Sequence, residues 1–379
     1  MKKIPCSYYK INKECKNDLT TFKYNEEDKH HPLKLEREYV KALNATKVDK
    51  IMAKPFISSF SYHTEGITGL CKDYSGKYIA TSSFDKHVVI YDVFNKKCIK
   101  DIKMDDFING IGLNNNVLCV GQDTSVVVKR VGDLSSEEID LKNYLNSLDF
   151  YNNTIVTTHH DFINVIDLER NEVLNNISLQ GDNQVIKINK TFDNIIGVAS
   201  TNFHLYDIRM NKEIYKIDQS VNCVDFHENK IVFGSDKITV TDFRKLNEEY
   251  YGKKYFNKHT NEILSVNFSM TGHRIVSGSS DTTIRIENIN SKNSQIYYND
   301  RMGIVNGVSF SNCNSFIFSG SDDGSLRLWR SYPNAPSKNL SYQEEMSRLE
   351  NDRLKNKFKD FKEIQRIRNH SFYKKNYKK

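Results

Sequence analysis

The sequence has few of the features that mark membrane, secreted or metal-binding proteins. Its 379 residues include only 5 Pro, 1 Trp and 7 Cys. The cysteines are odd in number and form no Cys-x-x-Cys pair, which argues against a disulfide framework or a cysteine zinc site. No apolar run approaches the roughly 18–20 residues that span a bilayer, and no segment has the pattern of a secretory signal. We therefore expect a soluble protein of a reducing intracellular compartment.

Catalytic constellations are also missing. The glycines mark turns and form no phosphate-binding motif. The histidine pairs at 30–31 and 159–160 are adjacent and point apart, so they make poor joint ligands and we expect no metal. Ser280, Asp281 and His259 are the nearest approach to a triad, but hydrogen bonds that hold the fold explain them better. We expect no enzyme, no cofactor and no small-molecule substrate.

Positive charge is concentrated at the C-terminus. The net charge is +7, and residues 338–379 contain 13 Lys or Arg against 6 Asp or Glu. The rest of the chain is balanced, with 42 of each sign. A basic tail on a neutral body predicts an acidic partner, with nucleic acid as the first candidate.

Three segments of similar pattern reveal an internal repeat. HTEGITGLCKDYSGKYIATSSFDKHVVIYD begins at His63, a second copy begins at His259, and a third runs over 303–330. Each copy has an alternating strand, a turn, an apolar strand that ends in small residues, an Asp turn and a second alternating strand. This pattern is typical of a β-propeller blade.

The Asp of that turn gives the number of blades. It recurs at intervals of 34–45 residues, close to the roughly 40–45 residues of a WD-repeat blade. The seven turn positions are Asp85, Asp123, Asp161, Asn202, Asp236, Asp281 and Asp323. The fold class is therefore all-β, a seven-bladed WD-repeat β-propeller with an N-terminal extension and a basic α-helical C-terminal extension.

The residues that normally hold a WD blade together are only partly kept. The Trp-Asp dipeptide is replaced at most blade ends, for example by Tyr91-Asp92, and no repeat keeps all members of the buried hydrogen-bond network. Because incomplete polar networks stabilise less, we expect some blades to be irregular. The structural residues that we predict are His63, Asp85, His259, Asp281, Asp323 and Trp329.

Ring closure and the helical extensions complete the predicted organisation. The last repeat ends without an outer strand, and 55–60 is a lone strand that can seal the ring. The propeller thus spans 55–330. Residues 1–54 form an N-terminal extension with a helix over 35–52, and 331–379 form a tail with one amphipathic basic helix over 340–373.

A family resemblance follows from the segment HPLKLEREYVKALNATKVDKIMAKPF, residues 31–56, and from LKNKFKDFKEIQRIRNH, residues 354–370. Both resemble the suppressor-of-fibrillarin family of WD-repeat factors of the small-subunit processome, as does the order of the repeats and extensions. The resemblance implies a non-catalytic nucleolar scaffold of the 90S pre-ribosome. It also implies partners, namely pre-ribosomal RNA, a small nucleolar ribonucleoprotein and other processome proteins, and a role in 18S rRNA precursor processing, without a membrane.

The resemblance places partner contacts at both ends of the chain. The N-terminal block comprises Arg37, Glu38, Tyr39, Leu43, Asn44, Lys54 and Phe56. The tail residues expected to contact RNA or a partner are Arg353, Lys355, Lys357, Lys359, Lys362, Arg366, Arg368, Lys374 and Lys375. Packing of the block against the last blade, and of the tail helix on its own propeller, are the structural alternatives. The tail continues as RNHSFYKK where the family has a His/Arg-rich stretch, which suggests fewer partners.

A second function class remains open. Some relatives in this family resemble substrate receptors of cullin–RING ubiquitin ligases, whose mark is an Asp and an Arg two residues apart at a blade end. Asp207 with Arg209, and Asp242 with Arg244, fit this pattern loosely. Charge pairing at a strand end is the structural alternative.

Overall fold

The computed structural model describes residues 33–52, 55–93, 95–130, 136–141, 143–170, 172–179, 185–192, 194–245, 254–291, 294–333 and 342–369. Lys54, Lys374 and Lys375, which the sequence singles out, lie outside the described residues. The chain divides into two compact units. Residues 54–333 form one unit, and residues 1–53 together with 334–379 form the other.

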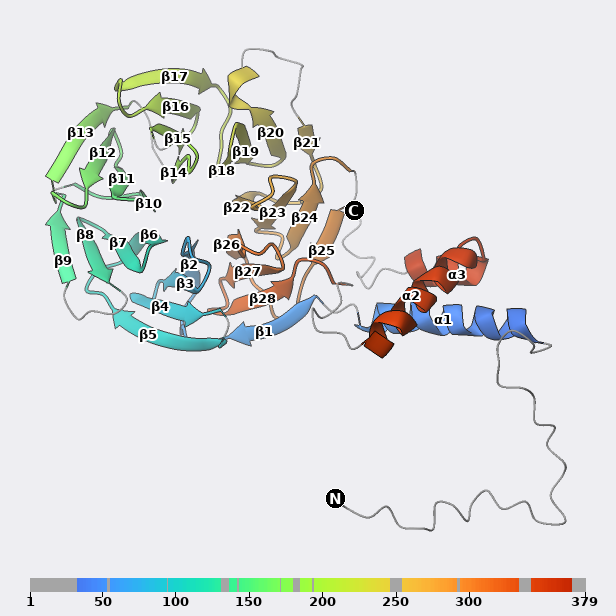
Figure 1. The fold of residues 1–379 in the computed structure, drawn as a ribbon. Helices are drawn as coiled ribbons and strands as arrows, with labels where there is room; N and C mark the ends of the chain where they lie inside the picture. The colour runs from blue at the N-terminus through green and yellow to red at the C-terminus, as the bar shows by residue number, and fades with distance from the viewer. Residues whose placement is uncertain are drawn as a thin grey trace, which may run out of the picture. The chain divides into compact units, whose positions relative to one another are not determined.

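The first unit is a ring of seven four-stranded antiparallel sheets, with the first strand of each sheet nearest the central axis (Figure 1). The first four sheets contain β2 (Ile67–Lys72), β3 (Tyr78–Ser83), β4 (His87–Asp92) and β5 (Lys97–Lys103); β6 (Ile108–Asn114), β7 (Val117–Gln122), β8 (Ser125–Arg130) and β9 (Ser136–Asp140); β10 (Ser147–Tyr151), β11 (Thr154–Thr158), β12 (Phe162–Asp167) and β13 (Glu172–Ser178); β14 (Val185–Ile188), β15 (Ile195–Ala199), β16 (Phe203–Asp207) and β17 (Lys212–Ile217). The other three contain β18 (Cys223–His227), β19 (Lys230–Gly234), β20 (Ile238–Asp242) and β21 (Lys254–Phe256); β22 (Ile263–Phe268), β23 (Arg274–Ser279), β24 (Ile284–Asn288) and β25 (Ser294–Tyr297); β26 (Val305–Phe310), β27 (Phe316–Ser321), β28 (Leu326–Arg330) and β1 (Phe56–Phe60). The predicted seven-bladed propeller is confirmed.

The N-terminal strand β1 completes the last sheet. It pairs antiparallel with β28, with Phe56 opposite Trp329 and Phe60 opposite Leu326. The ring of Phe56 lies edge-on to that of Trp329, with centroids 5.4 Å apart. The outer edge of β28 is therefore paired, and the chain passes from β1 directly into the first sheet, which closes the ring.

Separate hydrophobic clusters fill the spaces between neighbouring sheets. Each of the seven contains side chains from two adjacent sheets. The cluster between the last and first sheets includes Ile67, Phe318 and Leu328, with Phe60 of β1 packed against it. The second and third strands of the sheets are buried on both faces and are therefore mostly apolar without strict alternation, whereas the outer strands β5, β13 and β17 are largely exposed.

The seven turn residues counted from the sequence all lie between the second and third strands of their sheets. The number of strands is regular, because every blade has four strands. Shortening is marked in β21, Lys254–Phe256, which has three residues. The apolar contacts between sheets therefore hold the blades in shape where members of the polar network are missing.

The second unit is helical and is built from both ends of the chain. It contains α1 (Lys34–Met52), α2 (Tyr342–Lys357) and α3 (Lys362–Asn369). The helix expected over 35–52 is present. The single helix expected over 340–373 is wrong, because the chain breaks at 358–361 into two helices. Leu354, Phe358 and Ile364 are buried as the pattern suggests. Met346 and Leu349, which the same pattern placed on the apolar face, are 50% and 58% exposed.

The closing sheet yields a stability prediction. Trp329 is 1% exposed, stacks on Tyr297 at 5.8 Å and donates a hydrogen bond from Nε1 to Ser319 Oγ at 2.8 Å. We expect Trp329→Ala to lower the free energy of unfolding by about 3–5 kcal/mol, measured by circular dichroism in urea. Trp329→Phe keeps the ring packing and should lose less. An unchanged urea midpoint in the Ala variant would contradict the importance of this contact.

Candidate binding surfaces

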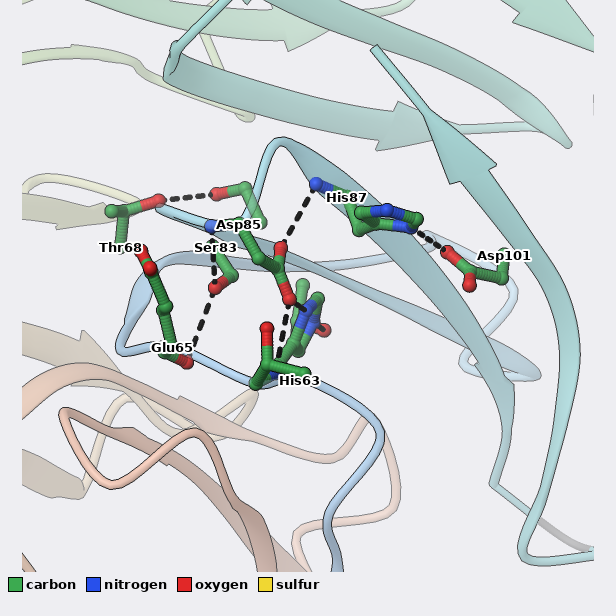
Figure 2. A network of polar contacts seen from close by, with 10 residues as sticks. His63, Glu65, Thr68, Ser83, Asp85, His87 and Asp101 are labelled. Atoms are coloured by element: carbon green, nitrogen blue, oxygen red, sulfur yellow. Dashed lines mark hydrogen bonds and ion pairs between the residues drawn. The ribbon is translucent and has the colours of Figure 1, made fainter.

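The turn residues hold the blades through hydrogen bonds, as Figure 2 shows for the first sheet. His63 Nδ1 lies 3.1 Å from Asp85 Oδ2, and His63 Nε2 lies 2.8 Å from Thr81 Oγ1. Asp85 also accepts bonds from the backbone N–H groups of Thr64 and His87. Burial lowers the pKa of His63 although the charge of Asp85 acts in the opposite direction. This arrangement joins the loop before β2 to the turn before β4.

The sixth sheet repeats the arrangement. His259 contacts Asp281 Oδ2 at 2.9 Å and Ser277 Oγ at 2.7 Å, while Asp281 also accepts from Thr283. The histidine nitrogens are therefore used by Asp281 and Ser277 and not by Ser280. Both nitrogens of this histidine are occupied in a buried fold contact, which supports the structural explanation of these residues over the triad.

The last sheet uses different side chains for the same task. Arg327, which is 4% exposed, donates to both carboxylate oxygens of Asp323. Trp329 donates to Ser319 on the neighbouring strand. Arg327 was missed from the sequence because its strand position gives no sign that it replaces the histidine.

The first strand of every sheet contributes residues to the lining of the central channel, and one position recurs on all seven strands. The residues at this position are Cys71, Gly112, Asp149, Lys187, Asp225, Asn267 and Ser309, and they border a cavity of about 140 Å³. Asp149 accepts from Lys187 Nζ and from the backbone N–H of Ile188, both at 2.8 Å. Asp225 accepts from the N–H of Phe268 at 2.7 Å. The carboxylates thus link neighbouring sheets.

The surroundings shift the pKa values of two channel lysines in opposite directions. Burial, assisted by the charge of Lys190, lowers the pKa of Lys72 to about 7. Burial also acts on Lys187, but the charge and hydrogen bond of Asp149 outweigh it and raise the pKa of Lys187. Sequence patterns did not indicate these residues, because strand alternation alone does not show which side chains meet at the axis.

The helical unit buries part of the predicted N-terminal block. Ala42 is fully buried with Leu354, Phe358 and Ile364, and Tyr39 and Leu43 pack against this cluster. The Tyr39 ring contacts those of Phe358 and Phe361 with centroids 5.7 and 5.2 Å apart. Its hydroxyl donates to Glu363 Oε2 at 2.6 Å.

Ion pairs fasten the same helices. Lys357 donates to Glu38, and Lys355 contacts both Asp49 and Asp352 at 2.6 Å. The hydrogen bond from Lys357 lowers the pKa of Glu38, with the charges of Lys34 and Arg353 adding to the effect. Two lysines that the sequence assigned to RNA or a partner are therefore engaged within the chain.

The remaining site residues differ in exposure. In the block, Asn44 is exposed, Arg37 is half-buried, and Phe56 lies on β1 beside Trp329 rather than on α1. Packing against the last blade therefore accounts for Phe56, whereas Tyr39 and Glu38 contact the C-terminal helices. The exposed basic residues of α2, α3 and the segment between them are Arg348, Arg353, Lys357, Lys359, Lys362, Arg366 and Arg368.

The two Asp-x-Arg sequences lie at equivalent positions, after β16 and β20. Arg244 donates to both carboxylate oxygens of Asp242 at 3.1 and 2.8 Å. Arg209 Nε lies 3.8 Å from Asp207 Oδ1. Both arginine side chains remain largely exposed, at 61% and 70%. The geometry fits charge pairing at a strand end and leaves the guanidinium groups accessible to a partner.

Metal sites and membrane spans are absent from the described residues. No group of three or more His, Cys, Asp or Glu side chains there could hold a metal ion. In the same part of the chain, no helix is both long enough and apolar enough to cross a membrane.

Comparisons with known proteins agree with this architecture. A profile of the WD domain, G-beta repeat, matches residues 54–92, 252–286 and 293–330. Protein SOF1 of Saccharomyces cerevisiae is 28% identical over 90% of this chain and 78% of its own length. DDB1- and CUL4-associated factor 13 is 27% identical in Xenopus tropicalis and 26% in Homo sapiens, over 94% of this chain and 85% of each relative.

The seven-sheet ring, its turn network and these matches define a WD-repeat protein. Within that class, the similarity extends beyond the repeats into the helical extensions. The similarity to these relatives agrees with the resemblance to the suppressor-of-fibrillarin family that the sequence indicated.

The helical unit can be tested through Phe358. This side chain is 7% exposed and contacts Tyr39 of α1. We expect Phe358→Ala to cost about 3–5 kcal/mol and to speed amide hydrogen exchange throughout α1. Leu349→Ala removes a side chain that is 58% exposed and serves as the control. Equal exchange in α1 for both variants would contradict the packing of α1 on the C-terminal helices.

The turn network predicts a pH dependence. Burial opposes ionisation of Asp281, but the hydrogen bond and charge of His259 outweigh it, so its pKa is lowered from 3.8. Stability from this carboxylate is therefore complete above pH 3.8 and is lost as the pH falls towards the folded-state pKa. We expect Asp281→Asn to be less stable at neutral pH by about 1–3 kcal/mol.

Urea midpoints measured across the acidic range check this prediction. The wild-type midpoint should fall more steeply on acidification than that of Asp281→Asn. Asp236→Asn, which changes an exposed turn carboxylate on the neighbouring sheet, should retain the wild-type slope. Parallel slopes for wild type and Asp281→Asn would show that another carboxylate dominates.

Proposed function

We propose that this chain is a non-catalytic scaffold of the small-subunit processome, located in the nucleolus. In this role it associates with a small nucleolar ribonucleoprotein and is needed for processing of the 18S rRNA precursor and for assembly of the small ribosomal subunit. The observation that carries the proposal is similarity to Protein SOF1 over 90% of the chain. Because the propeller unit covers residues 54–333, a similarity over this share of the chain extends beyond the repeats.

The fold supports a role in binding rather than catalysis. Buried histidines, serines and turn carboxylates are used in hydrogen bonds between loops of the same blade. The propeller therefore offers rigid surfaces made of exposed loops, which is how scaffold proteins present several binding sites at once.

The helical unit is the part best suited to contact RNA. Three cations, Lys34, Arg353 and Lys357, surround the single carboxylate of Glu38. The exposed residues Lys359, Lys362 and Arg366 add further positive charge on and next to α3. At the start of α1, Leu33 and Val40 are 53% and 51% exposed and border a shallow hollow of about 320 Å³ with Arg37. Cations beside apolar side chains suit phosphate contacts together with a protein neighbour.

Affinity purification of the tagged chain in mild salt tests the proposal. Enrichment of pre-ribosomal RNA, a box C/D small nucleolar RNA and processome proteins is expected. Replacing Lys359, Lys362 and Arg366 by Gln should reduce RNA recovery, and the salt slope of RNA binding should fall by about one for each cation that binds a phosphate group. Replacing Glu344, Glu345 and Glu350 by Gln is the control and should not reduce RNA recovery. The absence of ribosomal precursors from the purified material would reject the proposal.

A role as substrate receptor of a cullin–RING ubiquitin ligase is the second candidate. Two observations favour it. Some relatives are named DDB1- and CUL4-associated factor 13, and the guanidinium groups of Arg209 and Arg244 are accessible at equivalent blade ends. Recovery of a cullin adaptor by the wild-type chain but not by Arg209→Ala/Arg244→Ala would support this function. Recovery of ribosomal precursors without an adaptor would reject it.

A further inference from the structure

The two ends of the propeller differ in charge. In antiparallel sheets, the loops that join successive blades lie at the same end as the loops between second and third strands. The described residues of these loops include thirteen Asp or Glu and four Lys or Arg. At the opposite end, the described loop residues include three Asp or Glu and seven Lys or Arg. We call the first end the acidic face.

The turn network does not account for this excess. Asp85, Asp281 and Asp323 serve their turns and neighbouring side chains. A further set of carboxylates on the acidic face is exposed and makes no ion pair with another described residue. This set comprises Glu65, Asp105, Asp106, Asp236, Glu262 and Asp322. Unpaired like charges on one surface raise the energy of the free protein, and a cationic ligand relieves that repulsion.

A depression concentrates two of these carboxylates. It has a volume of about 520 Å³ and lies between the turn before β20 and the loop before β22. Asp236 and Glu262 both line it, together with Lys237 and the amide side chains of Asn257 and Asn261. The depression is large enough for the end of one Lys or Arg side chain, whose donors these oxygens would accept.

Aromatic side chains lie on successive blades of the same face. Phe84, Phe107 and Tyr144 are 52%, 49% and 59% exposed, and they come from the turn before β4 and the loops before β6 and β10. Lys86 Nζ already lies 4.8 Å from the ring centroid of Phe107. The ring therefore binds a cation within the protein itself, and the exposed neighbouring rings offer the same contact to an incoming one.

We propose that the acidic face binds an extended, Lys/Arg-rich segment of a partner protein. Carboxylates at Asp105 and Asp106 and in the depression bind its cations, while the aromatic side chains pack against its guanidinium groups and aliphatic stems. Unpaired charge and exposed rings on one surface carry this assignment. The same charges repel nucleic acid, so this face is distinct from the surfaces proposed for RNA.

Fluorescence anisotropy with the full-length chain tests the proposal. The probe is a labelled peptide in which Lys and Arg alternate with Gly and Ser, compared with the same peptide carrying Gln at every Lys and Arg. The basic peptide should bind in a salt-dependent manner and the Gln peptide should not. Asp236→Asn/Glu262→Gln and Asp105→Asn/Asp106→Asn should each weaken binding by about threefold to tenfold, as expected when two exposed ion pairs are removed. Phe84→Ala/Tyr144→Ala should weaken it by a similar factor.

Glu169→Gln/Glu228→Gln is the matched control, since it makes the same change of net charge at the opposite end of the propeller. It should leave the affinity for the basic peptide unchanged. Equal weakening by the control and the face variants would overturn the proposal. A second comparison uses a chain that ends at residue 369. If this shorter chain bound the peptide and the full chain did not, the acidic face would be occupied by the protein's own basic tail, and the proposal would also be overturned. Recovery of pre-ribosomal RNA tests the scaffold function separately.

Discussion

Each of the two units is completed by contacts between an N-terminal and a C-terminal segment of the chain. In the propeller, β1 from the N-terminus is the outer strand of a sheet whose other strands are the last three of the ring. In the helical unit, α1 packs on α2 and α3, with Tyr39 bonded to Glu363 and Ala42 enclosed by Leu354, Phe358 and Ile364. Neither unit can be completed until the C-terminal part of the chain is present. The N-terminal residues that carry the family resemblance therefore have a role in folding. Only the side chains that this packing leaves exposed can contact partners.

The propeller keeps its regular shape although its polar network is degenerate. The complete arrangement of histidine, turn Asp and hydroxyl is present in the first and sixth sheets, and Arg327 replaces the histidine in the last. The apolar clusters between sheets are present at all seven interfaces. Burial of apolar surface is not directional, so it tolerates substitutions that a hydrogen-bond network does not. This difference explains why every blade keeps four strands although members of the polar network are missing.

The fold was predictable from local patterns, and the sites were less so. The recurring turn Asp and the lone strand at 55–60 were enough to predict seven blades and their closure. The break between α2 and α3 was not predictable, because Phe358, Phe361 and Ile364 fit the spacing of one continuous helix. The pattern of α1 likewise showed an apolar face but not what covers it, so contacts of Tyr39 with the C-terminal helices were not foreseen. Arg327 and the residues of the channel depend on which strands face each other in three dimensions. The acidic face needed one further step, since its charge is evident only after loops are sorted by the end of the ring on which they lie.

Charge separation limits where each class of partner can bind. Phosphate groups are repelled by the loops that carry Asp105, Asp106 and Asp236, whereas the cations around Glu38 and near α3 attract them. A basic protein segment has the opposite preference. Because exposed charges separated by more than the Debye length, about 8 Å at physiological ionic strength, are largely screened, each preference acts only on a partner that is close to the surface carrying the charge. Under the two proposals, an RNA and a basic protein segment would bind different surfaces of the chain and would not compete for one site, which is the property that an assembly scaffold requires.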